Sequence, residues 1–194
     1  MSGHSKWSTI KHKKGIADAK RGKLFTKLGR AITVAAAKAN AKGLKAEYLM
    51  QNPVGPLGIT IDKAKAASMP KENILRAIDR GTGEGVTSGL DEFTLEGYGP
   101  EGVAILVPIL TDNRNRTLAE IRKIFELAGG SLEQAGSAAY VFGSDPENPS
   151  FTIPVTDKEK AQRILRLIEN LEDQDDVQEV YSNFDIPDEF LEEA

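Results

Sequence analysis

The sequence predicts an α+β protein with a basic, helical amino-terminal domain and a ferredoxin-like carboxy-terminal domain. The first observation is charge: residues 1–80 hold 17 Lys and Arg against 5 Asp and Glu, whereas residues 81–194 hold 8 against 24. The second is the spacing of apolar residues, which changes from helical to alternating near residue 93. These changes predict a basic extended arm (1–22), a helical domain (23–81), a linker (82–90) and an α/β domain (91–194).

Three helices are predicted in the helical domain. An apolar stripe at helical spacing begins at Leu24 and runs to about residue 41. A second, short helix is expected after Pro56. A third runs from Pro70, which suits a first helical turn, to Gly81, which suits a helix end. Their apolar faces are expected to pack together as a small bundle.

The α/β domain is predicted to place two helices on one face of an antiparallel sheet. Residues 93–98 alternate apolar and polar side chains, and residues 103–110 are apolar throughout, as in a buried central strand. From residue 103 onward the predicted order is βαββαβ, the ferredoxin-like arrangement, with one additional strand before it. The remaining predicted elements are a helix at 115–128, strands at 138–142 and 151–155 joined by a hairpin at 143–150, a helix opened by a Thr156–Glu159 capping box, and a strand at 177–181.

The composition supports no catalytic, metal or cofactor site. The chain has no Cys, which excludes disulfides and thiolate zinc sites, and His4 and His12 lack the spacing of a metal-binding pair. The glycines at positions 81, 83 and 85 follow a helix, so they match no nucleotide-binding loop. The acidic run 172–176 is interpreted as a solvated edge. We therefore expect a protein that is not an enzyme and that needs no cofactor.

The sequence also bears on where the protein works. The amino terminus lacks the apolar segment of a secretory signal, and no run of about 18 apolar residues could span a membrane. The lack of Cys suits a reducing compartment. A cytoplasmic location is expected, and neither a membrane nor a small-molecule substrate is expected as a partner.

Cations cluster in the arm and the first predicted helix. Such a cluster attracts phosphates and releases their counterions, and aromatic rings between the cations can stack on unpaired bases. DNA and RNA fit this chemistry equally. The alternative is a basic tail that only aids solubility, with its single Trp packed against the helices. The predicted nucleic-acid-binding residues are Lys6, Trp7, Lys11, His12, Lys13, Lys14, Lys20, Arg21, Lys23, Lys27 and Arg30.

A second anion or nucleic-acid site is predicted at residues 111–117 (TDNRNRT), directly after the apolar strand. Asp112 or Asn113 is placed to cap the following helix, which puts Arg114 and Arg116 in its first turn. The helix dipole disfavours cations there unless an anion is bound, so the arrangement favours a phosphate. The alternative is a plain cap with solvated arginines. The predicted residues are Asn113, Arg114, Asn115 and Arg116.

Segments spread over nearly the whole chain resemble the YebC/PmpR family. The resemblance implies a cytoplasmic bacterial protein without catalysis, of the kind named "probable transcriptional regulatory protein", that binds DNA. It also implies kinship with mitochondrial translational activators of cytochrome c oxidase, and relief of ribosome stalling at proline runs is attributed to the family. The segments are 3–7 (GHSKW), 10–14 (IKHKK), 18–27 (DAKRGKLFTK), 62–65 (DKAK), 69–71 (MPK), 96–100 (EGYGP) and 111–117 (TDNRNRT).

The chain departs from the family pattern in length. Family members usually carry a third α/β subdomain between the strand matching 138–142 and the segment from Ile153 onward, and here residues 143–150 bridge that gap. Residues 52–60 also replace a more basic and more helical segment. Charge and resemblance together predict a nucleic-acid-binding regulator of gene expression that binds DNA. The alternatives are a translation activator associated with the ribosome or ribosomal RNA, and a protein-interaction adaptor.

Overall fold

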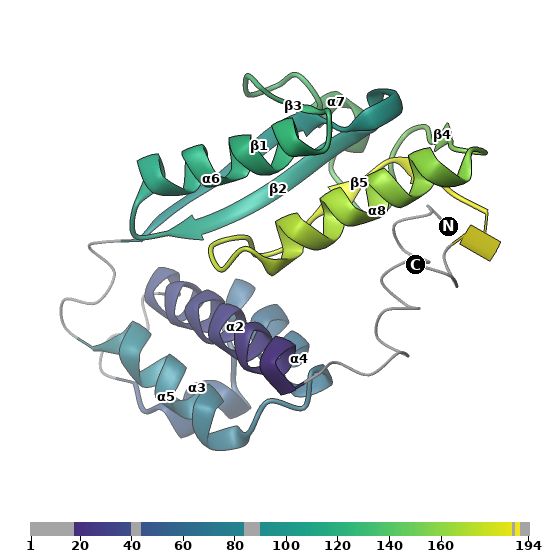
Figure 1. Cartoon of the computed structure of the whole chain (residues 1–194). Helices are drawn as coiled ribbons and strands as arrows, with labels where there is room; N and C mark the ends of the chain where they lie inside the picture. Colours follow the sequence, from purple (N-terminus) through teal and green to yellow (C-terminus); the bar gives the residue numbers. More distant parts are fainter. Residues whose placement is uncertain (1–17, 40–43, 84–89, 188, 191–194) are drawn as a thin grey trace. The chain divides into compact units, whose positions relative to one another are not determined.

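The computed structural model describes residues 18–39, 44–83, 90–187 and 189–190, with side chains from Arg21 onward. The chain divides into two compact units, a helical unit spanning Asp18–Leu90 and an α/β unit that contains Asp91–Ala194 (Figure 1). Each unit has its own hydrophobic core. The α+β class predicted from the sequence is therefore confirmed.

In the part of the helical unit that the structure describes, the chain forms four helices: α2 (Asp18–Lys38), α3 (Ala46–Gln51), α4 (Pro56–Ala66) and α5 (Lys71–Thr82). The three predicted helices are confirmed as α2, α4 and α5, whereas α3 was not predicted. Helix α2 begins at Asp18, inside the segment predicted to be extended, because Ala, Lys and Arg at 19–21 favour a helix and one Gly at 22 costs only about 1 kcal/mol. Ile32, Leu49, Leu57, Ile61 and Ile78 form the centre of the core.

Helices α2 and α5 approach each other closely at a glycine. A Cβ atom at Gly81 would lie 2.2 Å from the carbonyl oxygen of Thr33 and 2.8 Å from the Cβ of Ala36. The Thr33 hydroxyl lies 3.0 Å from the carbonyl oxygen of Ala77 on α5. The two backbones can therefore touch only because residue 81 has no side chain.

The α/β unit is built on a four-stranded antiparallel sheet. Its strands are β1 (Asp91–Tyr98), β2 (Ala104–Thr111), β3 (Ser131–Glu133) and β5 (Tyr181–Ser182), in the order β3-β1-β2-β5. Strands β4 (Ile153–Pro154) and β6 (Phe184–Asp185) form a separate parallel pair. The helical elements are η1 (Pro100–Gly102), α6 (Arg114–Leu127), α7 (Ala139–Phe142) and α8 (Lys158–Asp173).

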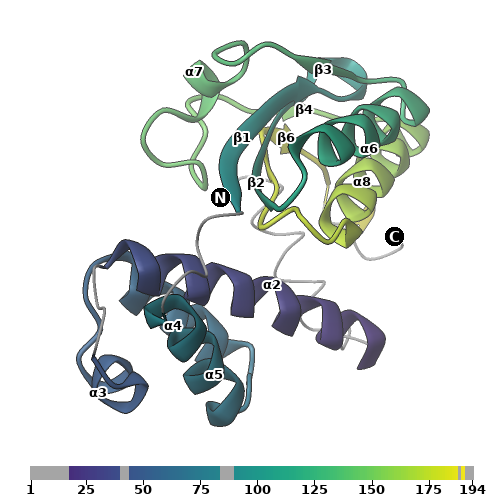
Figure 2. The same cartoon turned by 90° about the vertical axis from the view of Figure 1, so that its left-hand side faces the viewer.

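The two faces of the sheet are covered differently, as Figure 2 shows. Helices α6 and α8 pack on one face, where Ile105, Val107 and Ile109 of β2 join the main core. The short helix α7 lies on the other face, where Val141 and Phe142 pack on Ala104 and Leu106 in a smaller cluster. Because successive side chains of a strand point to opposite faces, β2 contributes to both cores and is apolar along its length.

The expected strand at 138–142 and its hairpin with 151–155 are wrong. Residues 139–142 form α7, and the strand that follows α6 is β3 instead. The carboxylate of Glu96 accepts hydrogen bonds from the backbone N–H groups of Gly136, Ala138 and Ala139 at 2.7–2.8 Å, which turns the chain into a helix there. A cap supplied by a residue about forty positions away cannot be recognised from local apolar spacing. Along the chain, the elements from β2 to β5 therefore run βαβαβαβ and not βαββαβ, because α7 lies between β3 and β4, and β4 pairs with β6 outside the four-stranded sheet.

Two smaller expectations are also corrected. Helix α8 begins at Lys158 and is capped by Asp157, whose carboxylate accepts the backbone N–H of Lys160 at 3.0 Å, and not by Thr156. The strand predicted at 177–181 pairs at its two ends and is not continuous: Val177 forms an isolated bridge with Ile109, and β5 begins at Tyr181. Within the described ranges, no helix is long and apolar enough to cross a membrane.

Candidate nucleic-acid interface

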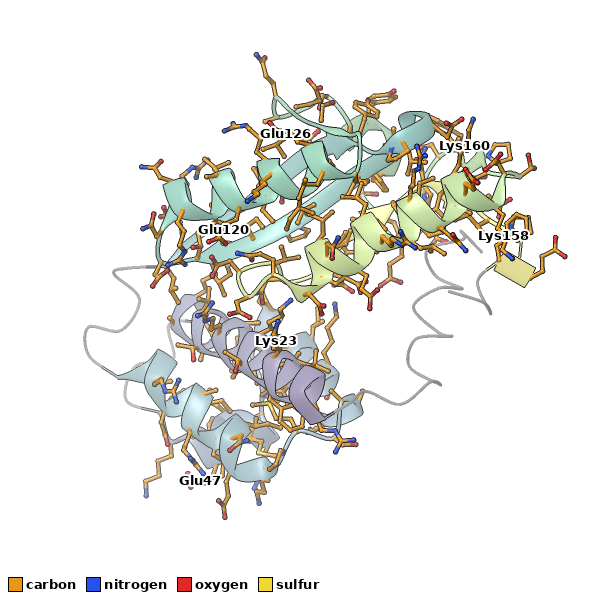
Figure 3. The ribbon with its side chains drawn as sticks, viewed as in Figure 1. Lys23, Glu47, Glu120, Glu126, Lys158 and Lys160 are labelled. Carbon is orange, nitrogen blue, oxygen red and sulfur yellow. The ribbon has the colours of Figure 1, made fainter. Side chains whose placement is uncertain are left out.

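Helix α2 carries the part of the predicted basic surface that the structure describes. Lys20, Lys23, Lys27 and Arg30 recur at a spacing of three or four residues, which places them along one side of the helix. Arg21 and Lys23 are exposed, Arg30 is half-buried and Lys27 is buried, and Lys23 is labelled in Figure 3. The side chain of Lys20 lies outside the part of the chain that the structure describes. The row of cations on α2 therefore reaches the surface at Lys23 and Arg30 but not at Lys27.

The predicted binding residues before Asp18 lie outside the described residues. No contact is therefore assigned to them. They are Lys6, Trp7, Lys11, His12, Lys13 and Lys14.

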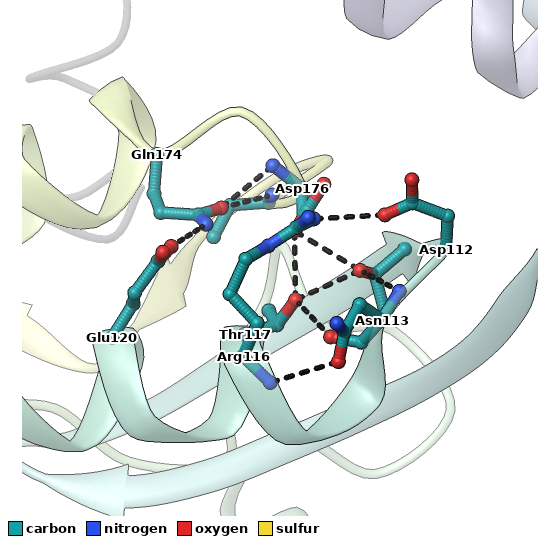
Figure 4. Close-up of polar contacts among 9 residues, drawn as sticks. Asp112, Asn113, Arg116, Thr117, Glu120, Gln174 and Asp176 are labelled. Carbon is teal, nitrogen blue, oxygen red and sulfur yellow. Dashed lines mark hydrogen bonds and ion pairs between the residues drawn. The ribbon is translucent and has the colours of Figure 1, made fainter.

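The second predicted site lies at the start of α6, and its cap is confirmed. Asn113 is the N-cap residue, and its side-chain oxygen accepts the backbone N–H of Arg116 at 3.1 Å. The guanidinium of Arg116 donates to Asp112 at 2.8 Å and to Asp176 at 3.0 Å (Figure 4). Two carboxylates thus already neutralise the arginine that was predicted to attract a phosphate. Any anion bound there would have to compete with them.

Asp176 is the centre of this network. Its side chain is only 2% exposed, and it accepts hydrogen bonds from the hydroxyls of Thr117 at 2.7 Å and Thr111 at 3.0 Å. Burial would raise the pKa of Asp176, but the hydrogen bonds from Thr117, Arg116 and Thr111 and the positive charge of Arg116 outweigh it and lower the pKa to about 2. The same contacts raise the pKa of Arg116, chiefly through its hydrogen bond to Asp176. The carboxylate joins the start of α6 to the segment after α8.

The interpretation of residues 172–176 as a solvated acidic edge is therefore wrong for Asp176. Its signal in the sequence is weak, because a single buried Asp inside an acidic run looks like its exposed neighbours. Only its partners, about sixty residues earlier in the chain, distinguish it.

The other two residues of the predicted site behave differently from Arg116. The guanidinium of Arg114 lies 3.9 Å from the centre of the Phe93 ring on β1, and the residue is exposed. This is a cation–π contact, which leaves the N–H groups at the edge of the guanidinium free to donate. Asn115 is also exposed. Of the two arginines, Arg114 therefore has the geometry that suits contact with a ligand.

The EGYGP segment proves to be structural. Burial would raise the pKa of Glu96, but the three backbone N–H groups that it accepts lower it. The Tyr98 hydroxyl donates to the carbonyl oxygen of Ser137 at 2.6 Å. A Cβ atom at Gly97 would lie 2.5 Å from the carbonyl oxygen of Ser131 and 2.7 Å from the Phe125 ring. The segment therefore holds β3 and the residues before α7 against β1.

Protonation of Asp176 in acid should lower the free energy of unfolding of the protein. A carboxylate whose folded pKa lies below its unfolded value of about 3.9 contributes stability above that value and loses it as the pH falls through the folded pKa. With a folded pKa of about 2, the contribution of about 2 kcal/mol should disappear between about pH 4 and pH 2. Urea unfolding of the wild type and of Asp176→Asn should therefore differ at pH 6 and converge at about pH 2. A constant difference across this range would contradict the assignment.

Comparison with known proteins decides the family. The model for the TACO1/YebC protein N-terminal domain matches residues 5–84, and the model for the TACO1/YebC second and third domain matches residues 90–145 and 147–184. The chain belongs to the TACO1/YebC family. The resemblance noted from the sequence motifs is thereby confirmed.

Named relatives of this TACO1/YebC protein span its whole length. It is 41% identical to a "Probable transcriptional regulatory protein" of Syntrophobacter fumaroxidans, with 99% of each chain covered. It is 42% identical to one of Coxiella burnetii, covering 98% of this chain and 100% of the relative. The crystal structure of a conserved hypothetical protein, Aq1575 from Aquifex aeolicus, matches with a TM-score of 0.73 and 32% identity, covering 88% of this chain and 92% of that one.

This family member is short. Its alignment with the Syntrophobacter relative spans 254 positions, and the chain has 194 residues, so at least 60 positions hold no residue of this chain. The family match of the second and third domain is interrupted at residue 146. That residue lies between α7 and β4, inside the segment 143–150 that was predicted to bridge the missing subdomain.

Among the described residues, no group of three or more His, Asp or Glu is placed to hold a metal ion.

Proposed function

We propose that this protein is a non-enzymatic regulator of gene expression that binds DNA through its basic amino-terminal part. The names of its relatives support a regulatory role. The observation that carries the proposal is the segregation of charge, with a net charge of +12 on residues 1–80 inside a chain of net charge −4. Same-sign charges repel one another, so such clustering costs stability unless a polyanion binds.

The chemistry of the cations suggests how binding works. Of the binding residues predicted in the arm and α2, seven are Lys, two are Arg, one is His and one is Trp. Lysine ammonium groups contact phosphates as point charges and read few base edges, whereas arginine recognises guanine with two parallel hydrogen bonds. Contacts of this kind position the protein on a nucleic acid without selecting a sequence. Arg114 and Asn115, exposed at the start of α6, are the proposed contacts in the second unit.

The same observation favours a second candidate, a translation activator associated with the ribosome. A lysine-rich surface that tolerates any sequence suits structured ribosomal RNA as well as DNA. Sedimentation of lysate through sucrose gradients, before and after ribosome dissociation, separates the two. Comigration of the protein with ribosomal particles would favour translation, and its absence from them together with recovery on DNA would favour transcription.

Replacing Lys11, Lys13 and Lys14 with Ala should weaken binding to DNA and to RNA alike. Each phosphate contact releases about one counterion, so the slope of log K against log salt should fall by about two to three units. Fluorescence anisotropy with labelled duplex DNA and single-stranded RNA, over a range of salt, measures this slope.

The matched control removes three lysines from the α/β unit, Lys123, Lys158 and Lys160. Lys158 and Lys160 are exposed in the first turn of α8 (Figure 3). If net charge alone decides the affinity, both triple variants should lose binding equally, and the arm would then have no special role. An unchanged slope in the arm variant would remove the arm from the binding surface.

A further inference from the structure

Helices α4 and α5 are joined by a connection of only four residues, 67–70. Two nested backbone hydrogen bonds close the end of α4. The N–H of Met69 donates to the carbonyl oxygen of Ala64 at 2.9 Å, and the N–H of Ser68 donates to that of Lys65 at 2.9 Å. Ser68 has a φ of 59°, in the left-handed region. This is a Schellman turn, which ends one helix sharply and lets the next begin at once.

The connection and α5 are both packed against α2. Met69 is only 8% exposed and belongs to the core of the helical unit. A Cβ atom at Gly29 of α2 would lie 3.9 Å from the terminal methyl group of Met69, and the other end of α5 touches α2 at Gly81. Three packed helices, of which the last two are joined by a turn of three or four residues, are typical of helix-turn-helix DNA-binding domains.

The exposed side of α5 carries a stripe of three polar side chains. Asn73, Arg76 and Arg80 follow one another at spacings of three and four residues, which places them on one side of the helix. Arg76 and Arg80 are exposed, and Asn73 is half-buried. Seven residues at a rise of about 1.5 Å cover about 10 Å, which equals about three base pairs at about 3.4 Å each.

The residue types in this stripe are those that read base edges. In the major groove of DNA, arginine makes two parallel hydrogen bonds to guanine, and asparagine makes two to adenine. The predicted binding residues of the arm and α2 are mostly lysines, which contact phosphates as point charges. Helix α5 therefore offers the recognition chemistry that the lysine-rich surface lacks.

Both arginines of the stripe are available to a ligand. Arg76 forms an ion pair with Glu72 at 3.5 Å, but these side chains are 66% and 85% exposed. An exposed pair of this kind contributes little to stability, so a ligand can replace it. Arg80 makes no ion pair or side-chain hydrogen bond with any residue that the structure describes. The fold itself therefore has little need of either guanidinium.

We propose that α4 and α5 form a helix-turn-helix unit, and that α5 enters the major groove of duplex DNA with Asn73, Arg76 and Arg80 against the base edges. This inference rests on the proposed function, DNA binding by the basic amino-terminal part, and adds sequence selection to it. The lysines hold the protein on phosphates, and α5 selects the site. Duplex RNA is not the ligand of α5, because its major groove is too deep and narrow for side chains to read.

The test mixes the full chain with a pool of duplex DNA that has a randomised centre, and the bound fraction is sequenced. The wild type should enrich a motif of about three or four base pairs that contains guanine and adenine. Arg76→Lys and Arg80→Lys keep the charge but lose the paired hydrogen bonds. Each should lower the preference for one guanine about tenfold and leave the slope of log K against log salt unchanged. Asn73→Ala should lower the preference for one adenine in the same way.

Arg122→Lys and Arg163→Lys are the matched controls, because they make the same change at exposed arginines of α6 and α8. These variants should enrich the same motif as the wild type. An equal change in test and control variants would overturn the inference.

Two further outcomes separate this inference from the proposed function. Salt-dependent binding of DNA without an enriched motif, or with a motif that Arg76→Lys and Arg80→Lys leave unchanged, would overturn the role of α5 and leave the proposed function in place. Failure of the wild type to bind any duplex DNA would refute the proposed function, and the role of α5 with it.

Discussion

Replacing Gly81 with Ala is expected to destabilise the helical unit by about 3 kcal/mol. The added Cβ would lie 2.2 Å from the carbonyl oxygen of Thr33 and 2.8 Å from the Cβ of Ala36. Both obstacles belong to the rigid frame of α2, so no side-chain rotation can relieve them, and α2 and α5 must move apart. Because α2 carries the row of cations from Lys20 to Arg30, the same change should weaken nucleic-acid binding. Hydrogen exchange of the amides of α2 and α5 measures the loss within this unit.

Gly22→Ala is the matched control. It is the same substitution in the same unit, but the added Cβ would meet no described atom within 4 Å beyond the nearby backbone of α2 itself. Alanine favours a helix over glycine, so this variant should stabilise α2 by up to about 1 kcal/mol. If the amides of α2 and α5 were protected from hydrogen exchange equally well in Gly81→Ala and in Gly22→Ala, the close approach of the two helices would not exist in solution.

Elements whose signals are local were predictable from the sequence. Helix α5 needs only its apolar spacing and Pro70 at its start, although it runs past the predicted stop at Gly81 and is capped by Gly83. Strand β2 needs only its apolar run. Helix α3 was not predicted because its six residues have no capping side chain and are too few to show a clear helical spacing of apolar residues. Strand β3 and helix α7 were not predicted for another reason. Their conformations depend on β1, which pairs with β3 and supplies the Glu96 carboxylate to the residues before α7.

The candidate sites divide in the same way. The sequence predicted a cap at Asp112 or Asn113, and Asn113 is that cap, because a cap bonds only a few residues along the chain. It also placed two arginines in the first turn of α6 but could not separate their roles. Phe93 and Asp176, which distinguish Arg114 from Arg116, come from strand β1 and from the segment after α8. The binding role predicted for the arm stays a prediction, since its residues before Asp18 lie outside the described part of the chain.

Replacing Asp176 with Ala is expected to destabilise the α/β unit by about 3 kcal/mol. The change removes an acceptor shared by the hydroxyls of Thr111 and Thr117, both buried, although Thr117 can still donate to the carbonyl oxygen of Asn113. It also removes one of the contacts between α6 and the segment after α8. Asp176→Asn keeps the size and one acceptor oxygen, so its loss should be smaller. Thermal and urea unfolding measure the loss of stability in both variants. Hydrogen exchange of the α6 amides shows whether the loss lies in this unit. A loss confined to α2 and α5 would contradict this placement.

The same network predicts how the two arginines of α6 differ. Arg116→Gln should lower stability, although less than Asp176→Ala, because the arginine side chain is 45% exposed and water can replace part of its contact. Its nucleic-acid affinity should change little, since two carboxylates already occupy the guanidinium. Arg114→Gln should show the reverse, with stability nearly kept and binding weakened, because among the described residues a contact with the Phe93 ring alone holds this side chain. Measured together, the two variants separate a residue that builds the fold from one that meets the ligand. If Arg116→Gln kept full stability and lost binding, the phosphate site first predicted at this helix start would be correct. Asp112 and Asp176 would then be groups that a bound phosphate displaces from Arg116.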